Sequence, residues 1–334
     1  MKHILNHLFE HKSFDRAEAK AILKDIALGS YTNTQVAAFM TVYGMRAITV
    51  AELQGFRDAM LDLASPLKIY EDYELIDLCG TGGDGKNTFN ISTLASFILA
   101  GAGYKVAKHG NYGVSSGCGS SNVMEYLGLK FKAEEALLNR SLDEAGICFL
   151  HAPLYHPAMK TVAPIRKELG VKTFFNMLGP MVNPVKPAYQ MVGVFNLELA
   201  RLYAYLYQHS GNKYTIVHAL DGYDEVSLTG DFKTFSEQGE QLHPLSSLGF
   251  VALKAEAIQG GNTIPEAAQY FTAILRGQGT QAQNQVVLSN AALGIQTLNR
   301  GMNFHSAYAQ AEESLFSKKA FQSFNTLIQL HAKN

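Results

Sequence analysis

The chain has 334 residues, of which 47% are apolar, with 28 Lys and Arg against 29 Asp and Glu. This length allows two domains or one large one, and the composition is that of a packed globular protein. A formal net charge of −1 gives no global attraction to nucleic acid or to an acidic membrane, so we expect the chain to bind neither.

The three cysteines, Cys79, Cys118 and Cys148, are far apart and show no C-x-x-C spacing. Disulfide and metal-binding roles are therefore disfavoured, and free thiols in a reducing compartment are expected. The first residues are too polar for a signal peptide, and no run of about 18 apolar residues occurs. We therefore expect a cytoplasmic protein without a membrane segment.

Residues 1–66 predict a succession of helices and contain no strand pattern. Thr32 and Thr49 are each followed three residues later by Gln or Glu, which is the spacing of a capping box at a helix start. The last of these helices is expected to stop just before Pro66, because proline disfavours helical geometry in the residue that precedes it.

From about residue 74 the pattern changes to short apolar runs that alternate with helical segments. The predicted strands are ELIDLCG, KVAKHG, ICFLHAP, AYQMVGVF and YTIVHALDG. This alternation is typical of an α/β layer with parallel strands. Residues 228–262 show no clear pattern except FVALK (250–254), which we interpret as a further strand, and the chain from residue 264 onward is expected to be helical.

The predicted fold class is therefore α/β. A small helical domain, residues 1–68, is expected to precede a larger α/β domain, residues 74–334, with a mainly parallel central sheet.

The segment GTGGDGKNTFNIST, residues 80–93, joins the first predicted strand to a helix, which is the context of a phosphate-binding loop. A dinucleotide fingerprint needs an acidic residue about 20 residues later, and no Asp or Glu occurs between Lys86 and Cys118. A P-loop needs Ser or Thr where this chain has Asn87. Asp84 inside the loop instead suits a sugar hydroxyl or a pyrophosphate that carries Mg²⁺.

Hydroxyl and amide side chains gather where the next helix begins, at Thr88, Asn90, Ser92 and Thr93. Ser92 and Thr93 have a plain alternative as helix N-caps. The number of such residues within a short stretch favours a polyanion site.

A second cluster, KHGNYGVSSGCGSSNVMEYLG (108–128), follows the second predicted strand. Ligands of open α/β sheets bind at the carboxyl ends of the strands, where this loop is expected to lie. It offers Lys108, His109 and Asn111 together with several glycines and serines. A loop of this length within a compact domain is more often functional than a plain solvated connection.

These two segments resemble those of the anthranilate phosphoribosyltransferase family, and so do residues 156–184 and 218–230. The resemblance covers essentially the whole chain in order. It implies a nucleoside phosphorylase/phosphoribosyltransferase-like fold and a homodimer that contacts through the helical domain. It also implies transfer of the phosphoribosyl group of phosphoribosyl pyrophosphate to the amine of anthranilate, with release of pyrophosphate, which is the second step of tryptophan synthesis from chorismate.

The resemblance further implies the site residues. Those that match the phosphoribosyl pyrophosphate site are Gly80, Gly83, Asp84, Thr88, Asn90, Ile91, Ser92, Thr93, Lys108, His109, Gly110, Asn111, Tyr112, Gly113, Val114, Ser115, Ser116 and Ser120. Those that match or lie close to the anthranilate site are Gly80, Asn111, Arg166 and His156. The Mg²⁺ ligands of the family match Ser92, Asp224 and Glu225, whose oxygens are of the kind that hard cations prefer. No covalent nucleophile is expected.

Several of these residues also have plain structural interpretations. Taken alone, Asp224 and Glu225 are typical of a solvated acidic turn, and Arg166 is typical of a surface helix residue. His109 and His156 would serve equally well as buried histidines with satisfied hydrogen bonds.

Two positions depart from the family's motifs: Tyr112 stands where the family commonly has Arg, and Asn122 stands where it commonly has Asp. The missing positive charge at Tyr112 bears on substrate affinity rather than on the class of reaction. We expect Lys108 and the loop amides to provide most of the binding.

Two other functions remain as alternatives. A pyrimidine nucleoside phosphorylase has the same fold, but its loop K-x-S-x-G-G-x-G-D is missing from this sequence. A non-enzymatic relative that binds nucleic acid is disfavoured by the net charge of −1 and by the full set of candidate residues. A NAD-linked oxidoreductase is disfavoured because the acidic residue of the dinucleotide fingerprint is absent.

Overall fold

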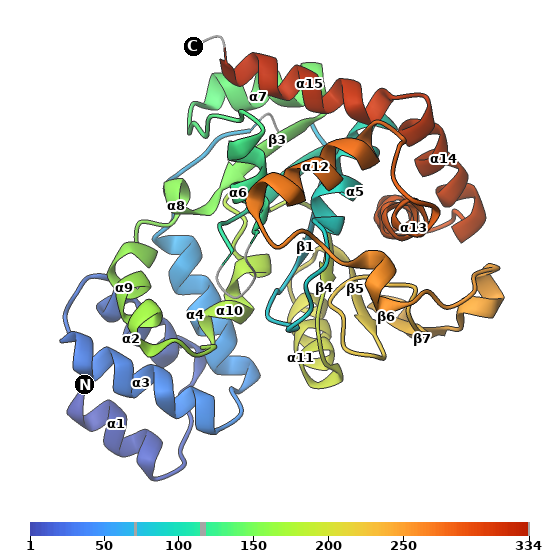
Figure 1. Cartoon of the computed structure of the whole chain (residues 1–334). Coiled ribbons are helices and arrows are strands. Elements are labelled where there is room, and N and C mark those ends of the chain that lie inside the picture. Colours follow the sequence, from blue (N-terminus) through green and yellow to red (C-terminus); the bar gives the residue numbers. More distant parts are fainter. Residues whose placement is uncertain (70–71, 114–117, 333–334) are drawn as a thin grey trace. The chain divides into compact units, whose positions relative to one another are not determined.

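The computed structural model describes residues 1–69, 72–113 and 118–332, and its elements are labelled in Figure 1. The chain divides into two compact units. The helical unit comprises Met1–Leu67 and Ala152–Lys186, and the α/β unit comprises Lys68–His151 and Pro187–Asn334.

The helical unit contains two separate pieces of the chain. Its helices are α1 (Lys2–Phe9), α2 (Arg16–Ala27), α3 (Asn33–Met45), α4 (Val50–Asp62), α8 (Ala152–Tyr155), α9 (Met159–Leu169), α10 (Phe175–Leu178) and the 3₁₀ turn η1 (Gly179–Met181). The sequence assigned residues 152–186 to the larger domain, and the structure instead packs them with the N-terminal helices. The reason is an aromatic cluster in which Phe174 stacks on Phe56 with ring centroids 4.6 Å apart and meets Tyr43 edge-on at 5.2 Å.

The predicted helix starts in this unit are confirmed. Thr32 caps α3 and Thr49 caps α4, each within a complete capping box. Such reciprocal bonds satisfy two backbone groups that a helix start leaves unpaired. Helix α4 ends at Asp62, a little earlier than the expected stop before Pro66.

A seven-stranded sheet forms the centre of the α/β unit in the described residues, with the order β3-β2-β1-β4-β5-β6-β7. The strands are β1 (Leu75–Gly80), β2 (Lys105–Gly110), β3 (Ile147–His151), β4 (Tyr189–Gly193), β5 (Lys213–Ala219), β6 (Phe232–Ser236) and β7 (Gly239–His243). The first five pair in parallel, and β6 and β7 add an antiparallel edge. The predicted α/β class and its mainly parallel sheet are confirmed.

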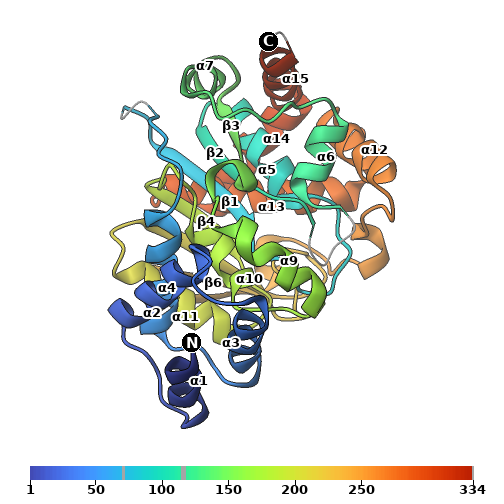
Figure 2. The ribbon, with the colours of Figure 1, turned by 90° about the vertical axis from the view of Figure 1, so that its left-hand side faces the viewer.

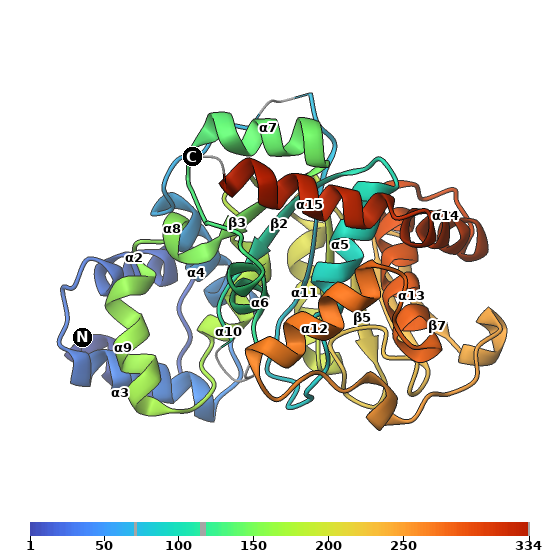
Figure 3. The ribbon, with the colours of Figure 1, turned by 45° about the horizontal axis from the view of Figure 1, so that its top comes forward.

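Helices cover both faces of this sheet, as Figures 2 and 3 show. They are α5 (Ile91–Gly101), α6 (Ser120–Tyr126), α7 (Glu135–Ala145), α11 (Leu197–Gln208), α12 (Ile264–Leu275), α13 (Gln281–Leu298), α14 (Phe304–Phe316) and α15 (Lys319–Ala332), with 3₁₀ turns η2 (Leu245–Leu248) and η3 (Ala255–Ile258). Helices α5 and α13 pack on one face, and α11 packs on β5 and β6 from the other (Figure 3). Helix α5 is buried almost all round, since Leu94, Phe97 and Ile98 are each fully buried.

The region that showed no clear sequence pattern contains the β6–β7 hairpin. The predicted strand at 250–254 is wrong, because these residues pair with no strand that the structure describes and their amides bond to carbonyls outside the sheet. The Phe250 amide donates to the Leu245 carbonyl, and the Leu253 amide donates to the Leu228 carbonyl at 2.8 Å. No helix in the described part of the chain is long and apolar enough to cross a membrane.

The strand order places a topological switch between β1 and β4. From β1 the chain proceeds outward through β2 to β3, and from β4 it proceeds in the opposite direction to β5. Because parallel crossovers are right-handed, the helices that follow β1 and β4 lie on opposite faces of the sheet. A crevice is therefore expected at the carboxyl ends of these two strands.

Candidate functional site

Strands β1 and β4 end side by side in glycine. Gly80 and Gly193 are partners in the parallel register, and the Thr81 amide donates to the Gly193 carbonyl at 2.9 Å. The predicted glycine loop begins here, so it starts at the switch point of the sheet. This is where an open α/β sheet binds its ligands.

The turn after β5 places Asp224 in contact with the backbone at Gly80 and Gly193. Its carboxylate oxygen Oδ2 accepts a hydrogen bond of 2.7 Å from the Gly82 amide. A Cβ atom at Gly80 would lie 2.4 Å from that oxygen, and one at Gly193 would lie 1.5 Å from the Asp224 carbonyl oxygen. Both strand ends must therefore be glycine for the acidic turn to reach the loop. Gly193 was not among the predicted site residues, and it lies inside the predicted strand AYQMVGVF rather than at its end.

Asp224 and Glu225 are buried, with exposed fractions of 7% and 9%. They are therefore not the solvated acidic turn that was the plain alternative. Burial, followed by the nearby Asp84 carboxylate, raises the pKa of Asp224 to about 7. Burial and the Asp224 charge also raise the pKa of Glu225 well above its usual range, against the opposing effects of Lys108 and a hydrogen bond with Ser92. The site thus places two carboxyl groups close together where burial disfavours their charged forms.

This donor set fits a Mg²⁺ ion that arrives with a phosphate ligand. Within the described ranges, no group of three or more His, Cys, Asp and Glu side chains forms a complete metal cage. Mg²⁺ does not require one, because it is usually bound through one or two carboxylates together with water and substrate phosphates. The Ser92 side chain lowers the pKa of Glu225, so two of the three predicted ligands lie close together.

The glycine loop after β1 is built from left-handed residues. Gly82, Gly83 and Gly85 have φ values of +66°, +79° and +75°, a backbone region that other residues rarely adopt. The Asp84 carboxylate accepts the Lys86 amide at 2.9 Å, which closes the turn. The loop can therefore expose several amides to an anion, as a phosphate cradle requires.

Lys86, which had no assigned function, contacts the acidic turn. Its ammonium nitrogen lies 4.4 Å from the centre of the buried Tyr223 ring, next to Asp224 in the chain. The loop is also braced by a distant segment, since the Gly260 amide donates to the Asn87 carbonyl at 2.7 Å. An isolated bridge pairs Thr88 with Gln259. These braces fix the loop before any ligand binds.

Helix α5 begins immediately after the loop. Its N-cap is Asn90, not Ser92 or Thr93, and the Asn90 side-chain amide donates to the Cys118 carbonyl at 3.1 Å. The Ser92 hydroxyl contacts Glu225 instead. The positive end of this helix therefore lies beside the buried carboxylates and the glycine loop, a position suited to an anion.

Lys108 lies inside strand β2, with only 2% of its surface exposed. Its ammonium group donates to the Leu78 carbonyl at 2.7 Å. Its positive charge lowers the pKa of Glu225, so it acts on the buried carboxylates. Lys108 is thus a buried counter-charge rather than the first residue of a solvated loop.

The rest of the second cluster lies at the end of β2. His109 is buried, and its amide donates to the Asp77 carboxylate at 3.2 Å. Gly110 is required by packing, because a Cβ atom there would lie 2.5 Å from the Phe149 ring. Asn111 is exposed. The predicted contacts Val114, Ser115 and Ser116 lie outside the described residues.

Arg166 and His156, two of the predicted anthranilate residues, belong to the helical unit. The Arg166 guanidinium donates to the Asn176 side-chain oxygen at 3.2 Å and lies 5.5 Å from the Phe175 ring centre. It is half-buried, and burial lowers its pKa, so it is not a freely solvated side chain. His156 is 2% exposed, and burial lowers its pKa. Hydrogen bonds with the backbone of Val182 and Met60 oppose this effect. This buried environment favours a structural role.

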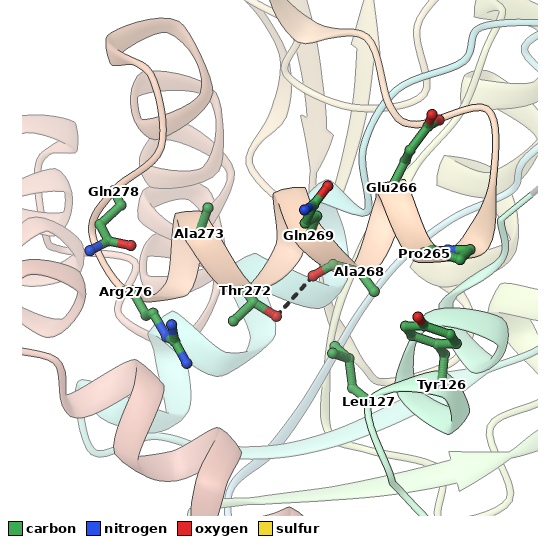
Figure 4. A pocket seen from close by; sticks show the side chains of 10 residues that line it. All are labelled: Tyr126, Leu127, Pro265, Glu266, Ala268, Gln269, Thr272, Ala273, Arg276 and Gln278. Atoms are coloured by element: carbon green, nitrogen blue, oxygen red, sulfur yellow. Dashed lines mark hydrogen bonds between the residues drawn. The ribbon is translucent and has the colours of Figure 1, made fainter.

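A surface pocket of about 520 Å³ lies between α6 and α12, away from the predicted residues (Figure 4). Two of its polar side chains bond within or next to their own helix. The Thr272 hydroxyl donates to the Ala268 carbonyl, and the Glu266 carboxylate accepts the Asn262 and Thr263 amides. We therefore place the functional site at the glycine loop and not in this pocket.

Family models match both parts of the chain. A model described as the α/β domain of a glycosyl transferase family matches residues 72–321, and one for its helical bundle domain matches residues 2–64. The second match stops before the segment 152–186 that packs with those helices.

Curated relatives and solved structures are similar over almost the full length. The chain is 56% identical over 330 residues to the anthranilate phosphoribosyltransferase of Christiangramia forsetii and 58% identical over 330 residues to that of Flavobacterium psychrophilum, with 99% of both chains covered in each case. The anthranilate phosphoribosyltransferase of Thermus thermophilus superposes with a TM-score of 0.90 at 30% identity, over 98% of both chains. The Saccharomyces cerevisiae enzyme in complex with PRPP and Mg superposes with a TM-score of 0.90 at 25% identity, over 99% of this chain and 97% of that one.

Proposed function

Because the chain belongs to the anthranilate phosphoribosyltransferase family, we propose that it transfers the phosphoribosyl group of phosphoribosyl pyrophosphate to the amine of anthranilate. The products are N-(5-phosphoribosyl)anthranilate and pyrophosphate. The observation that carries the proposal is the buried pair Asp224 and Glu225, joined to the glycine loop at the switch point by the bond from the Gly82 amide.

The glycine loop is proposed to receive the pyrophosphate. The three left-handed glycines give the loop a backbone that can present amides to an anion, and the N-terminus of α5 adds positive potential. Both groups favour negative charge that grows on the leaving pyrophosphate as the bond to ribose C1 breaks. Since these groups are fixed before the reaction, they need little reorganisation during it.

Ser92, Asp224 and Glu225 are proposed to hold Mg²⁺. When bound, the ion supplies charge neutralisation for the departing pyrophosphate. The protein contributes a site in which two buried carboxylates repel one another and Lys108 only partly compensates. A divalent cation held by these residues would relieve that repulsion.

The attacking group is proposed to be the anthranilate amine, which is uncharged near neutral pH and needs no strong base. Its nitrogen forms the bond to ribose C1 while the bond from C1 to pyrophosphate breaks, and the amine then loses a proton. Arg166 is proposed to bind the anthranilate carboxylate, because a guanidinium offers paired donors to a carboxylate. Gly80 and Asn111 complete the predicted contacts, and positioning provides most of the remaining acceleration.

We also propose a homodimer that forms through the helical unit. Its support is the exposure of large apolar side chains there, namely Phe9 at 61%, Leu28 at 73% and Met45 at 86%. Covering these side chains with a second copy of the chain would remove apolar surface from water, which favours association. Sedimentation equilibrium at micromolar concentration gives twice the chain mass if the proposal holds and the chain mass if it does not.

Anthranilate fluorescence tests the proposed reaction directly. Emission is expected to fall when protein, Mg²⁺ and phosphoribosyl pyrophosphate are mixed with anthranilate, and to remain constant when any one of them is omitted. Unchanged emission in the full mixture, together with phosphate-dependent cleavage of thymidine, would instead establish a pyrimidine nucleoside phosphorylase.

A further inference from the structure

The first turn of α6 connects two stretches of backbone through a single side chain. The Asn122 oxygen Oδ1 accepts the Gly113 amide at 2.9 Å and the Gly119 amide at 3.1 Å. Because both partners are N–H donors, the oxygen and not the nitrogen of the Asn122 amide must face them. We call residues 111–113 together with Gly119 the neck.

Further contacts hold the neck closed. The Ser121 amide donates to the Asn111 carbonyl at 3.1 Å. A Cβ atom at Gly119 would lie 2.1 Å from the Gly113 amide nitrogen, so the two backbone stretches touch directly. The neck is therefore a fixed structure in which Asn122 is the central acceptor.

Tyr112 is anchored away from the neck backbone. Its hydroxyl donates to the Glu125 carboxylate, with oxygen–oxygen distances of 3.2 and 3.3 Å. Its ring meets the His151 ring edge-on at 4.7 Å, and His151 in turn stacks on Phe131 at 4.2 Å. Tyr112 thus attaches the neck to α6 and to the end of β3, without adding a charge.

The neutrality of Asn122 has a physical consequence. A carboxylate at this position would accept both amides more strongly, because hydrogen bonds to charged acceptors are stronger. It would also lie one helical turn from Glu125, a repulsive spacing for like charges, and close to a loop that must receive a polyanion. An amide oxygen keeps the two hydrogen bonds and adds no negative charge.

We propose that Asn122 and Tyr112 form a neutral clamp that positions the neck for phosphoribosyl pyrophosphate, with Asn122 fixing Gly113 and Gly119 and Tyr112 anchored on Glu125 and His151. Both are positioning residues. The clamp rests on the proposed function, because it assigns the polyanion at this loop to that substrate.

Two substitutions at Asn122 separate geometry from charge. Asn122→Ala removes both hydrogen bonds and is expected to raise the KM for phosphoribosyl pyrophosphate by about tenfold, with kcat and the KM for anthranilate nearly unchanged. Asn122→Asp keeps an acceptor and adds a charge, so it is also expected to raise this KM. Only the effect of Asn122→Asp should shrink as salt concentration rises, because salt screens charges.

Tyr112→Phe tests the anchor on the other side of the neck. It keeps the ring on His151 and removes the hydroxyl that binds Glu125, so a rise of about threefold in the same KM is expected. Because both residues act on one neck, the double variant Tyr112→Phe/Asn122→Ala should raise KM by less than the product of the two single effects.

Asn303→Ala is the matched control. Asn303 caps α14 by accepting the Ser306 amide at 2.9 Å, so its loss removes a comparable bond at a helix start far along the chain. It is expected to lower the melting temperature by a few degrees and to leave both KM values unchanged. The clamp is refuted if Asn122→Ala leaves the KM for phosphoribosyl pyrophosphate within twofold of the parent, or lowers kcat alone.

Calorimetric titration of each protein with phosphoribosyl pyrophosphate and Mg²⁺ distinguishes failure of the clamp from failure of the proposed function. If the parent protein binds the substrate and Asn122→Ala binds it equally well, the clamp is wrong and the function stands. If the parent does not bind it at all, the proposed function is wrong and the clamp is refuted with it.

Discussion

Asp224 is a buried carboxylate that the folded protein holds preferentially in its protonated form. Its pKa of about 7 lies well above the value near 3.9 of an unfolded Asp. The folded state therefore binds more protons than the unfolded state between these two values. The contribution of Asp224 to stability is complete below pH 4 or so and is lost as pH rises through about 7.

Asp224→Asn should therefore stabilise the protein in the absence of Mg²⁺ and substrate at pH 8. The amide keeps an acceptor for the Gly82 amide and removes the buried charge, so we expect a gain in unfolding free energy of about 1–3 kcal/mol. The gain should disappear near pH 4, and phosphoribosyl transfer should fall sharply if Asp224 is the metal ligand that we propose. Urea denaturation at both pH values, together with the fluorescence assay, measures these effects.

Glu312→Gln provides the control for that experiment. Glu312 is an exposed carboxylate on α14, and its neutralisation should change the unfolding free energy by less than about 0.5 kcal/mol at either pH. A lower stability of Asp224→Asn at pH 8 would contradict the interpretation of Asp224 as a destabilising buried charge.

Arg166 is half-buried and already oriented by Asn176, so it is prepared to bind a planar carboxylate. Arg166→Lys keeps the charge and loses the paired donors, and it should raise the KM for anthranilate by about tenfold. The KM for phosphoribosyl pyrophosphate should stay the same. Lys167→Ala, at the exposed neighbouring position, should change neither value. An effect of Arg166→Lys confined to phosphoribosyl pyrophosphate would assign Arg166 to the other substrate.

At the scale of elements, the candidate site lies at the ends of β1 and β4. Both strands end in glycine, so no side chain fills the space there. The turn after β5 occupies the space that Cβ atoms at Gly80 and Gly193 would fill. Gly193 is therefore required because its backbone lies against the backbone of Asp224. A loop glycine, by contrast, is usually required for its backbone conformation. The clash distance of 1.5 Å at Gly193 involves a backbone carbonyl, which cannot rotate away as a side chain could.

Gly193→Ala should therefore lower the unfolding free energy by about 3 kcal/mol or more, or prevent folding. Gly44→Ala is the matched control, because Gly44 lies inside α3 with open space around it, and alanine there should stabilise the helix by about 0.5–1 kcal/mol. If Gly193→Ala folds with unchanged stability, the acidic turn does not need this glycine. Thermal unfolding of both variants gives the comparison.

The elements that the sequence predicted correctly are those with a strong local pattern. The parallel strands are apolar runs that end in glycine or polar residues, and capping boxes mark several helix starts. Strand β7 has no such pattern: its residues are almost all exposed, and it forms only because β6 pairs with it. The apolar run 250–254 was predicted as a strand because composition alone does not reveal whether a neighbouring strand is available.

The candidate site was predictable to the same degree. Motifs located the glycine loop, the acidic turn and the second cluster, because all three follow strands whose carboxyl ends meet at one edge. The contact of Asp224 with Gly193, the burial of Lys108 and the hydrogen bonds of Asn122 depend on distances between segments far apart in the chain. Local pattern carries no information about such distances.

At the scale of the whole molecule, the helical unit consists of two separate segments of the chain. The first 67 residues supply α1 to α4, and the chain returns after β3 to add α8 to α10. Phe174, which is fully buried, belongs to the second segment and packs on Phe56 and Tyr43 of the first segment. A hydrogen bond of 3.0 Å from the Thr161 hydroxyl to the Ala27 carbonyl also joins the two pieces.

This interleaving predicts that residues 1–67 do not form a stable unit alone. The fragment would expose the aromatic surface that Phe174 covers, and burial of one such ring contributes about 3 kcal/mol or more, which is a large part of the stability of a small helical bundle. The same fragment joined through a Gly/Ser linker to residues 152–186 should unfold cooperatively.

Circular dichroism during urea denaturation distinguishes the two fragments. Phe174→Ala in the joined fragment should abolish its higher stability, whereas Val171→Ala should change the stability by less than about 0.5 kcal/mol because Val171 is 64% exposed. If residues 1–67 alone unfold with the same midpoint and cooperativity as the joined fragment, residues 152–186 add no stability. The domain boundary near residue 68 that the sequence predicted would then describe the folding unit correctly.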